Sequence, residues 1–330
     1  MTLMQTAGSP RDACRVCGNA TGNGTHRARE TQFGMDEEFD YLECGRCGCL
    51  QLLDVPRDLA PYYAGAYYSF EPPGKRRQPA WLASLRRARS RHWLGERSLL
   101  GTIVSATRPA PEHFDWFRRA GLGLDARVLD VGCGSGKLLL RLKRDGFSNL
   151  AGIDPHLDQD RDADGVALRR AQLGEIDGQY DLVMLNHSFE HMTEPLAALG
   201  HVRRLLAPGG KTLVRVPVAG SYAWRKYGVN WGSLDAPRHV FLHTVDSMHR
   251  LAAQARFAIF EVVFDSTYRQ FFSSEMVLRH LPLNERDRHR GAVERPLMSE
   301  QQLDTFRQFA AELNRRRDGD TACFYLRPDG

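Results

Sequence analysis

The chain has 330 residues, of which 42% are hydrophobic and 26% are charged, and its formal net charge is +5. This length suits one large α/β domain with an accessory module, and the apolar share is ordinary for a globular protein. No apolar run approaches the roughly 20 residues that a bilayer-crossing helix needs, and the segment MTLMQTAGSPRDAC lacks the apolar core of a signal peptide. We therefore expect a cytoplasmic protein without a transmembrane segment.

Four cysteines near the N-terminus form two Cys-x-x-Cys pairs. Cys14 pairs with Cys17 and Cys44 with Cys47, on either side of a polar segment rich in Gly and Thr. Two such pairs can place four thiolates around one tetrahedral ion, as in a structural zinc ribbon, and disulfides are disfavoured in a cytoplasmic chain. The spacing predicts a module over residues 1–60 in which Zn²⁺ supports folding. Cys49 would either replace Cys47 as a ligand or stand outside the site.

Residues 61–111 connect this module to the rest of the chain. Tyr62–Phe70 (YYAGAYYSF) would either pack the module onto the main domain or line a sugar-binding face. The apolar spacing from Trp81 to Leu100 predicts a helix that lies as a flap outside the core fold. Lys75–Arg108 contains many arginines and a single acid, Glu96. This basic stretch predicts either a solvated helix face or a surface for the phosphates of a sugar nucleotide, a lipid-linked glycan, an RNA or a membrane.

A strand, a glycine turn and a helix follow one another near residue 130. Arg127–Val131 has the composition of a strand buried on both faces, and Asp130 precedes the turn. A second predicted strand, Leu150–Ile153, ends in Asp154, roughly 20 residues past the glycines, where an acid can accept both hydroxyls of a ribose. Together these features predict a site for a nucleotide-type cofactor at a helix N-terminus. The turn contains three glycines at alternate positions, Gly132, Gly134 and Gly136.

Residues 112–330 alternate predicted helices and strands, beginning with a short helix over Glu112–Ala120. The alternation predicts a Rossmann-like α/β fold with a seven-stranded, mostly parallel sheet and right-handed crossovers. Ligands of such sheets bind beyond the carboxyl ends of the strands, where Gly132, Asp154 and Asn186 fall. The predicted strands are Arg127–Val131, Leu150–Ile153, Val166–Arg170, Tyr180–Asn186, Lys211–Val216, Ile259–Asp265 and Thr321–Arg327, with a helix over Val245–Arg256 before the sixth.

Two further segments interrupt this alternation. Residues 217–244 form a long irregular stretch, and such stretches within a compact domain are usually functional. Its polar and aromatic side chains suit a polar, ring-shaped substrate, so we interpret it as an acceptor lid. Residues 270–317 predict an insertion of about two helices, which would cover the acceptor or form a homodimer contact. The candidate substrate-binding residues of the lid are Tyr222, Trp231, Asp235, Arg238 and His243.

Over about half its length the chain resembles the class I S-adenosylmethionine-dependent methyltransferases. VLDVGCGSG has the form of the family's first motif, and the acid of GIDP takes the place of its second-strand acid. Residues 180–195 (YDLVMLNHSFEHMTEP) and 205–217 (LLAPGGKTLVRVP) look like the family's fourth strand and its Pro-Gly-Gly turn into strand five. The resemblance implies S-adenosylmethionine as the cofactor, with Asn186 and His187 at its methionine end and Gln172 near its adenine. The cofactor-binding residues so implied are Asp130, Gly132, Gly134, Gly136, Asp154, Pro155, Gln172, Asn186 and His187.

Methyl transfer to a hydroxyl needs the acceptor held close to the methyl carbon and a base for its proton. Histidine suits that role at neutral pH. His187, His191 and His239 fall near the carboxyl edge of the predicted sheet, and Glu190 precedes His191 in SFEHM. We therefore name His191 and His239 as candidate bases, with Glu190 as a candidate catalytic residue beside them. A Glu-His pair at this position is also common in members of the family with other acceptors, so the alternative is that the pair here shapes the loop.

The cysteine module, the Tyr-rich linker and the Pro-Arg-His sequence of the lid resemble bacterial methyltransferases that act on sugars. Among these are zinc-containing deoxysugar C-methyltransferases, whose core is followed by a long C-terminal domain that this chain lacks. The difference favours O-methylation of a sugar, on a nucleotide-linked or lipid-linked glycan of a polysaccharide or natural-product pathway. The expected partner is thus a sugar-containing small molecule or a glycan.

Three other functions are open at this point. The first is C-methylation of a deoxysugar, and the second is methylation of RNA held by the zinc ribbon and the basic helix. Nucleic acid is disfavoured because Asn186-His187-Ser188-Phe189 differs from the Asn-Pro-Pro-aromatic signature of enzymes that methylate base amines. The third is a cofactor-binding scaffold without activity, against which the intact glycine turn and Asp154 argue.

Overall fold

The computed structural model describes residues 12–63, 80–96, 99–105, 109–285 and 297–329. The described residues fall into two compact units, each assembled from separate segments of the chain. Two strands, β9 (Leu206–Pro217) and β12 (Thr321–Pro328), contribute residues to both units. The unit that we call the cysteine unit comprises Met1–Gly65, Phe189–Leu196 and Arg215–Phe324, and the glycine-turn unit comprises Ala66–Ser188, Ala197–Val214 and Tyr325–Gly330.

Parallel strands form the centre of the glycine-turn unit. β4 (Arg127–Val131) lies between β5 (Asn149–Ile153) and β8 (Tyr180–Asn186) and pairs with both in parallel. β7 (Val166–Arg169) continues the sheet beyond β5 in parallel, and β6 (Arg161–Ala163) pairs with β7 in the antiparallel sense. The apolar composition of β4 follows from its central place, because residues of a strand covered on both faces are shielded from water.

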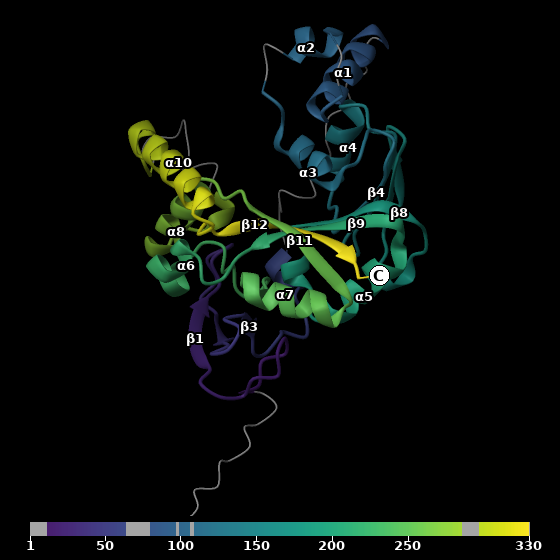
Figure 1. Ribbon diagram of the computed structural model, residues 1–330. Helices are drawn as coiled ribbons and strands as arrows, with labels where there is room; N and C mark the ends of the chain where they lie inside the picture. Colours follow the sequence, from purple (N-terminus) through teal and green to yellow (C-terminus); the bar gives the residue numbers. More distant parts are fainter. Residues whose placement is uncertain (1–11, 64–79, 97–98, 106–108, 286–296, 330) are drawn as a thin grey trace, which may run out of the picture. The chain divides into compact units, whose positions relative to one another are not determined.

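Over the described residues the sheet has eight strands in the order β11-β12-β9-β8-β4-β5-β7-β6, with β11 spanning Phe257–Phe264 (Figure 1). The predicted α/β fold with a mostly parallel sheet is therefore confirmed. The eighth strand is β6, whose sequence Arg-Asp-Ala carries no apolar alternation by which it could have been predicted. β9 is longer than the predicted strand Lys211–Val216, and the Pro-Gly-Gly sequence expected as a turn lies within it.

Five helices belong to the described part of the glycine-turn unit, one of them only in part. α3 (Glu112–Ala120) coincides with the predicted helix and ends where Gly121 adopts a left-handed φ of 67° and donates its N–H to the last turn. The ring of Phe117 in α3 lies 4.2 Å from that of Phe147, which anchors the helix. The remaining helices are α1 (Ala80–Trp93), α2 (Leu99–Ser105), α4 (Lys137–Arg144) and α5 (Pro195–Leu205), whose first two residues fall in the cysteine unit.

The single helix expected over Trp81–Leu100 is two helices. α1 ends at Trp93, and Gly95 follows with a φ of 99° that a helix cannot contain. The helix is also less detached than a flap outside the core, because the ring of Trp93 lies 4.9 Å from Phe114 of α3. Arg87 of α1 donates to the carbonyl of Gly146 at 3.0 Å, so at least one arginine of the basic stretch serves the fold itself.

An antiparallel sheet of four strands opens the cysteine unit. β1 (Gly24–Arg29), β2 (Glu38–Glu43) and β3 (Leu50–Leu52) pair in sequence order. The fourth strand, β10 (Phe241–Leu242), comes from the far end of the stretch interpreted as a lid and pairs with β3 through Leu242 opposite Leu50. Part of a segment expected to be irregular is therefore a strand of the sheet beside the cysteines.

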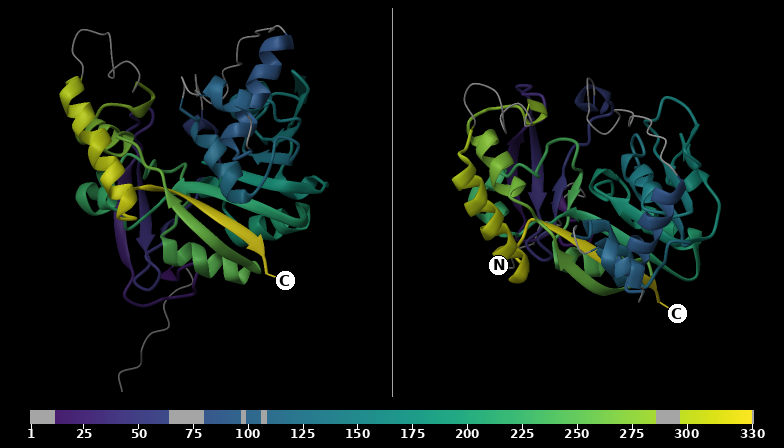
Figure 2. Two further views of the ribbon diagram at one scale, coloured as in Figure 1. Left: turned by 45° about the horizontal axis from the view of Figure 1, so that its top comes forward. Right: turned by 90° about the horizontal axis from the view of Figure 1, so that it is seen from above.

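The helices of the cysteine unit are α6 (Tyr222–Tyr227), α7 (Val245–Gln254), α8 (Arg269–Leu278) and α10 (Glu300–Arg315), with short 3-10 turns at Ala60–Tyr63, Phe189–His191, Gly228–Asn230 and Leu283–Glu285. α8 and α10 lie side by side and share a cluster that includes Phe272 and Leu303 (Figure 1). These are the two helices expected for the insertion, of which residues 286–296 lie outside the described part. α7 runs along β11 (Figure 2).

No helix among the described residues is long and apolar enough to cross a membrane. Of the aromatic stretch Tyr62–Phe70, only Tyr62 and Tyr63 belong to the described residues. Tyr62 is buried and its ring packs edge-on against Phe39, at 5.7 Å between centroids. The start of this stretch thus packs on the sheet of the cysteine unit, and the domain boundaries expected at residues 60 and 111 stay a prediction.

Candidate functional site

The glycine turn joins the end of β4 to the start of α4 and favours glycine at three alternate positions. Gly132, Gly134 and Gly136 have φ angles of 74°, 51° and 76°, all in the left-handed region. A Cβ on Gly132 would lie 2.4 Å from the Cβ of Ser188, and one on Gly136 would lie 2.7 Å from Leu168. The Ser188 hydroxyl donates to the carbonyl of Val131 at 2.6 Å and so keeps the ends of β4 and β8 together.

Asp154, at the end of β5, is tied to this turn. One of its carboxylate oxygens accepts the N–H of Gly134 at 2.9 Å, and the other accepts the N–H of His156 at 2.9 Å. Each oxygen keeps a second lone pair, which is what two ribose hydroxyls would need. The neighbouring Asp130 is buried, and burial, with the charge of Asp154 as a smaller cause, raises its pKa to about 7.

The turn and the carboxylate fit an adenosine-containing cofactor such as S-adenosylmethionine. A Cβ at Gly132 or Gly136 would collide with Ser188 or Leu168, and the turn leads into the N-terminus of α4. Asn186 ends β8 and is half-buried, and His187 follows it, exposed and with a φ of 53°. The other two residues implied by the resemblance are exposed: Pro155, next to Asp154, and Gln172, whose backbone N–H donates to the carboxylate of Glu175 at 2.7 Å.

The four cysteines of the two Cys-x-x-Cys pairs form a cluster in the cysteine unit. Their sulfur atoms all lie within 4.8 Å of one another, with 3.7 Å between Cys14 and Cys47 and 3.5 Å between Cys17 and Cys44. The sulfur-to-sulfur distance around tetrahedral zinc is about 3.8 Å, because each Zn–S bond is about 2.3 Å. The set therefore fits a closed structural zinc site, whose occupant remains a prediction.

Within the part of the chain that the structure describes, the four-cysteine group does not include Cys49. Its sulfur is fully buried and lies 3.8 Å from Nδ1 of His243 and 3.5 Å from the carbonyl of Leu50. Burial raises the pKa of the Cys49 thiol well above its ordinary value. Of the two alternatives for Cys49, the geometry favours the one outside the metal site.

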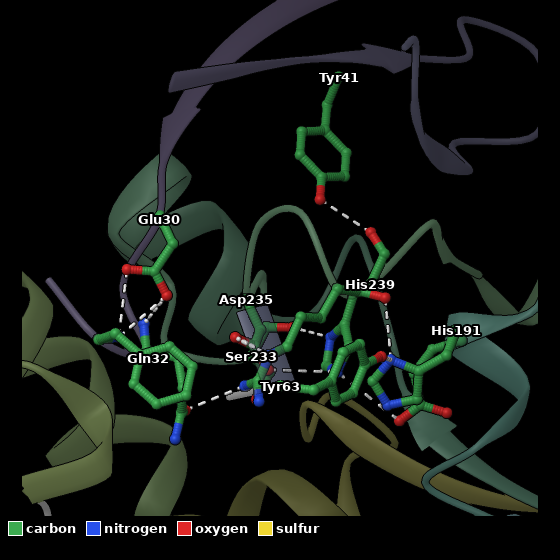
Figure 3. A network of polar contacts seen from close by, with 11 residues as sticks. Glu30, Gln32, Tyr41, Tyr63, His191, Ser233, Asp235 and His239 are labelled. Atoms are coloured by element: carbon green, nitrogen blue, oxygen red, sulfur yellow. Dashed lines mark hydrogen bonds and ion pairs between the residues drawn. The ribbon is translucent and has the colours of Figure 1, made fainter. Parts of the chain in front are cut away.

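A second polar cluster lies in the cysteine unit, where the turn Phe189–His191 meets the end of the stretch interpreted as a lid (Figure 3). We call it the acid–histidine cluster. The rings of His191 and His239 are edge to face, with 4.8 Å between their centroids. Nε2 of His239 lies 3.6 Å from a carboxylate oxygen of Asp235 and 4.0 Å from one of Glu190. The members of the cluster are Glu190, His191, Asp235, Arg238 and His239.

Backbone carbonyls orient both imidazole rings. Nδ1 of His239 lies 2.8 Å from the carbonyl of Ser233, and Nδ1 of His191 lies 2.8 Å from the carbonyl of Arg238 (Figure 3). A carbonyl oxygen can only accept, so Nδ1 carries the proton in each ring and Nε2 of a neutral ring has the lone pair. Desolvation, followed by the nearby His239, lowers the pKa of His191 to about 4.

Residues of the N-terminal module support the cluster, and sequence reasoning missed them. Gln32 accepts a hydrogen bond from Arg238 at 2.9 Å, while Arg238 also forms an ion pair with Asp235. Tyr41 donates to the carbonyl of His239 at 2.8 Å, and the hydroxyl of Tyr63 lies 3.1 Å from Nδ1 of His191. No local motif marks these contacts, because they join residues more than 120 positions apart in the sequence.

Glu30 holds the segment that carries Gln32. Its carboxylate accepts the backbone N–H groups of Gln32, Phe33 and Met35 at 2.7 to 3.1 Å (Figure 3). A buried carboxylate with several backbone donors is well compensated for its loss of water. Glu30 therefore fixes the loop after β1 and, through it, the side chain that contacts Arg238.

The five substrate candidates of the lid separate into two groups. Asp235 and Arg238 form the first group and belong to the acid–histidine cluster.

The second group consists of Trp231, His243 and Tyr222, which contact other parts of the cysteine unit. Trp231 is buried, and its indole N–H donates to Asp320 at 3.0 Å. His243 is also buried, with Nδ1 at 3.2 Å from the hydroxyl of Ser247, and burial lowers its pKa to about 4. The ring of Tyr222 packs against the rings of Phe271 and Phe309 in the insertion, with 6.3 and 5.1 Å between ring centroids.

Comparisons with known proteins address the glycine-turn region. Residues 104–262 match the family model described as a methyltransferase domain. The ubiquinone biosynthesis O-methyltransferase of Erwinia tasmaniensis is 28% identical over 156 residues, which are 43% of this chain and 62% of that protein. An uncharacterized 37.1 kDa transposon protein of Streptomyces fradiae is 28% identical over 182 residues, 47% of this chain and 51% of that one. The chain thus spans about half to 62% of the length of these relatives.

Among solved structures, an S-adenosylmethionine dependent methyltransferase of Mesorhizobium loti has a TM-score of 0.40 and 15% identity, over 66% of this chain and 98% of that one. Residues 104–262 are thus similar to a methyltransferase domain, and they include the glycine turn and the parallel strands β4, β5, β7 and β8.

Proposed function

We propose that this chain transfers a methyl group from S-adenosylmethionine to a hydroxyl of a sugar, carried on a nucleotide, a lipid or a polysaccharide. The observation that carries the proposal is the glycine turn at Gly132–Gly136, whose Gly134 N–H donates to the carboxylate of Asp154. Transfer to oxygen is supported by the Erwinia tasmaniensis relative, which is a ubiquinone biosynthesis O-methyltransferase. The sugar is inferred from the resemblance of the cysteine module and the lid.

In this proposal the residues of the glycine-turn unit hold the cofactor. Bound S-adenosylmethionine supplies a methyl group on a sulfonium, which is transferred by in-line displacement. Asp154 accepts the ribose hydroxyls with the lone pairs that the N–H groups of Gly134 and His156 leave available. The glycines allow close approach of the cofactor to the backbone, and the N-terminus of α4 presents N–H groups to its carboxylate.

We further propose that His239 accepts the proton of the acceptor hydroxyl. Its Nδ1 is held by the carbonyl of Ser233, so Nε2 is the basic nitrogen. The carboxylates of Asp235 and Glu190, at 3.6 and 4.0 Å from Nε2, would stabilise the imidazolium that forms. His191 lies against this ring and would position it, while the buried Trp231 and His243 serve the scaffold.

The decisive experiment incubates the purified chain with methyl-labelled S-adenosylmethionine and a panel of nucleotide sugars and lipid-linked glycans. We expect label in a sugar, with kcat lowered about 10²- to 10⁴-fold in His239→Gln and the dissociation constant of the cofactor unchanged. His249→Ala removes an exposed histidine of α7 and serves as the matched control. Cofactor binding without transfer to any acceptor would instead favour a scaffold.

A phenolic hydroxyl is a second candidate acceptor. It is favoured by the matches to ubiquinone biosynthesis O-methyltransferases from several bacteria, which are 28 to 32% identical over 30 to 43% of this chain. Simple catechols in the same panel distinguish the two classes. Label in catechols and in no sugar would replace the sugar proposal.

A further inference from the structure

We propose that Glu190, His191 and His239 form a second metal site, for a divalent transition metal of the zinc or iron(II) class. A ring nitrogen of each histidine and a carboxylate oxygen of Glu190 all lie within 4.8 Å of one another. The site shares no residue with the four-cysteine cluster, although both belong to the cysteine unit. All three residues are in described segments, and Glu190 and His239 are buried while His191 is half-buried.

The distances are close to those that an ion requires. With metal–ligand bonds of about 2.0 to 2.1 Å, the ligand atoms of a tetrahedral ion are about 3.4 Å apart. Nε2 of His239 and the nearer carboxylate oxygen of Glu190 are 4.0 Å apart. A side-chain movement of well under about 1 Å closes this difference, which is within the range of a rotamer adjustment.

The two imidazoles are already oriented as metal ligands. Their Nδ1 atoms face the carbonyls of Ser233 and Arg238, both at 2.8 Å. Metal-bound histidines almost always donate their second ring nitrogen to a carbonyl or carboxylate, which fixes the lone pair on the nitrogen that binds the ion. Here that arrangement leaves Nε2 as the ligand atom in both rings. The carbonyls of Ser233 and Arg238 therefore fix the orientation of the two imidazole rings. At His239 the ion would take the lone pair that the proposed function gives to the acceptor's proton, so His239 would act as that base only in the metal-free chain.

The charges around the cluster also favour a cation. Two carboxylates, those of Asp235 and Glu190, lie within 4.0 Å of the same nitrogen of His239, and Asp235 is also in an ion pair with Arg238. A nitrogen lone pair and a carboxylate oxygen repel each other unless a proton or a metal ion lies between them. Glu190 is 1% exposed, so water does little to offset its negative charge. A divalent ion would interact favourably with the lone pairs and with the carboxylate of Glu190.

The ligand set selects the class of metal. Two imidazole nitrogens and one carboxylate suit Zn²⁺, Fe²⁺, Co²⁺ or Ni²⁺, whereas Mg²⁺ and Ca²⁺ prefer oxygen ligands alone. Three protein ligands would leave a coordination position open, unlike the closed set of four cysteines. The ion would therefore be accessible to a further oxygen ligand, such as water or a hydroxyl.

Cobalt spectroscopy of the full-length chain tests the site without using methyl transfer. The protein is loaded with one equivalent of Zn²⁺ to fill the cysteine cluster and then titrated with Co²⁺. We expect a further equivalent of Co²⁺ to bind with visible d–d bands and without the thiolate charge-transfer band of a cysteine site. This equivalent should be lost in Glu190→Gln and in His239→Gln and retained in the control His249→Ala.

Two results would overturn the proposal: no second equivalent of Co²⁺ in the wild-type chain, or a second equivalent that persists in both Glu190→Gln and His239→Gln. Retained zinc and an unchanged circular dichroism spectrum show that a variant is folded. If His239→Gln fails to fold, the half-buried His191→Gln replaces it, with the same expected loss. Because the readout is metal binding, failure of this proposal and failure of the proposed methyl transfer are told apart.

Discussion

The glycine turn and the acid–histidine cluster are built in opposite ways. The turn is a run of neighbouring residues, Asp130–Gly136, completed by Asp154 one strand later. The cluster takes its members from two distant segments and its support from a third, since Gln32 contacts Arg238 across 206 positions. A site of the first kind depends on local backbone conformation, and one of the second kind depends on the folding of a whole unit. The two should therefore fail under different perturbations.

The largest expected effect is that of Cys44→Ser. Structural zinc contributes about 10 kcal/mol or more to the folding of small zinc modules, so removing one of four thiolates should unfold the sheet of β1, β2, β3 and β10. The acid–histidine cluster should be lost with it, since Gln32 and Tyr41 come from that module. Zinc content and thermal denaturation measure the loss. Cys49→Ala, which changes a buried cysteine outside the cluster, should keep its zinc, and equal zinc loss in both variants would contradict the assignment.

A pH titration of stability tests the buried acid beside the glycine turn. The pKa of Asp130 is raised from 3.8 to about 7, so between these values the folded chain keeps a proton that the unfolded chain has released. The free energy of unfolding without cofactor should therefore fall as the pH rises from about 4 to about 7, by at most about 4 kcal/mol from this group. Asp130→Asn should flatten that decline in urea unfolding. The same slope in both proteins would show that another group causes it.

Gly132→Ala should damage the turn and leave the cysteine cluster intact. The added methyl group would lie 2.4 Å from the Cβ of Ser188, and alanine is disfavoured at a φ of 74°. Overpacking and the left-handed backbone together predict a destabilisation of about 3 kcal/mol, seen by urea unfolding, with weakened binding of S-adenosylmethionine by calorimetry. Gly123→Ala is the control, since apart from its two chain neighbours no residue comes within 4 Å of its Cβ position. Loss of zinc in Gly132→Ala would end the contrast between the two sites.

The smallest effect expected is that of Asp154→Asn. The amide keeps the shape of the side chain but loses the charge and one acceptor, so hydrogen bonds from Gly134, His156 and the ribose weaken. Charge-assisted hydrogen bonds contribute about 1.5 to 3 kcal/mol, which predicts a roughly 10- to 100-fold higher dissociation constant for S-adenosylmethionine. Asp158→Asn changes an exposed acid past the same strand and should leave the affinity unchanged. Equal affinities in wild type and Asp154→Asn would remove Asp154 from the cofactor site.

The difference between the two sites also explains what the sequence could and could not predict. Asp130, the glycines and Asp154 were predictable because a strand, a turn and an acid at fixed spacing determine their own geometry. The cysteine pairs were predictable for the same reason. His191 and His239 were named individually from their chemistry and their place along the chain. They were expected near one edge of the sheet together with Glu190, but their direct contact and the part of Asp235 and Arg238 in it were not predicted, because no periodicity relates residue 190 to residue 239.

The supporting residues Gln32, Tyr41 and Tyr63 were missed for a related reason. The local sequence around each of them is typical of a polar strand or an aromatic linker. Only the tertiary structure brings these residues to the cluster. Trp231 and His243 were expected to contact substrate because aromatic and basic side chains in a long loop suggest binding. Both are buried, which the composition of the loop did not indicate, because part of the segment forms a helix and a strand.

The pairing of β10 with β3 has a consequence for how the protein is made. The two strands are about 190 residues apart, so at a synthesis rate of about 5 to 20 residues per second β3 emerges from the ribosome roughly 10 to 40 seconds before its partner. During that interval the cysteine module has an unpaired strand edge that can associate with another nascent chain. Early capture of zinc would hold the three N-terminal strands in register while the chain grows. The metal would then be needed most before the protein is complete.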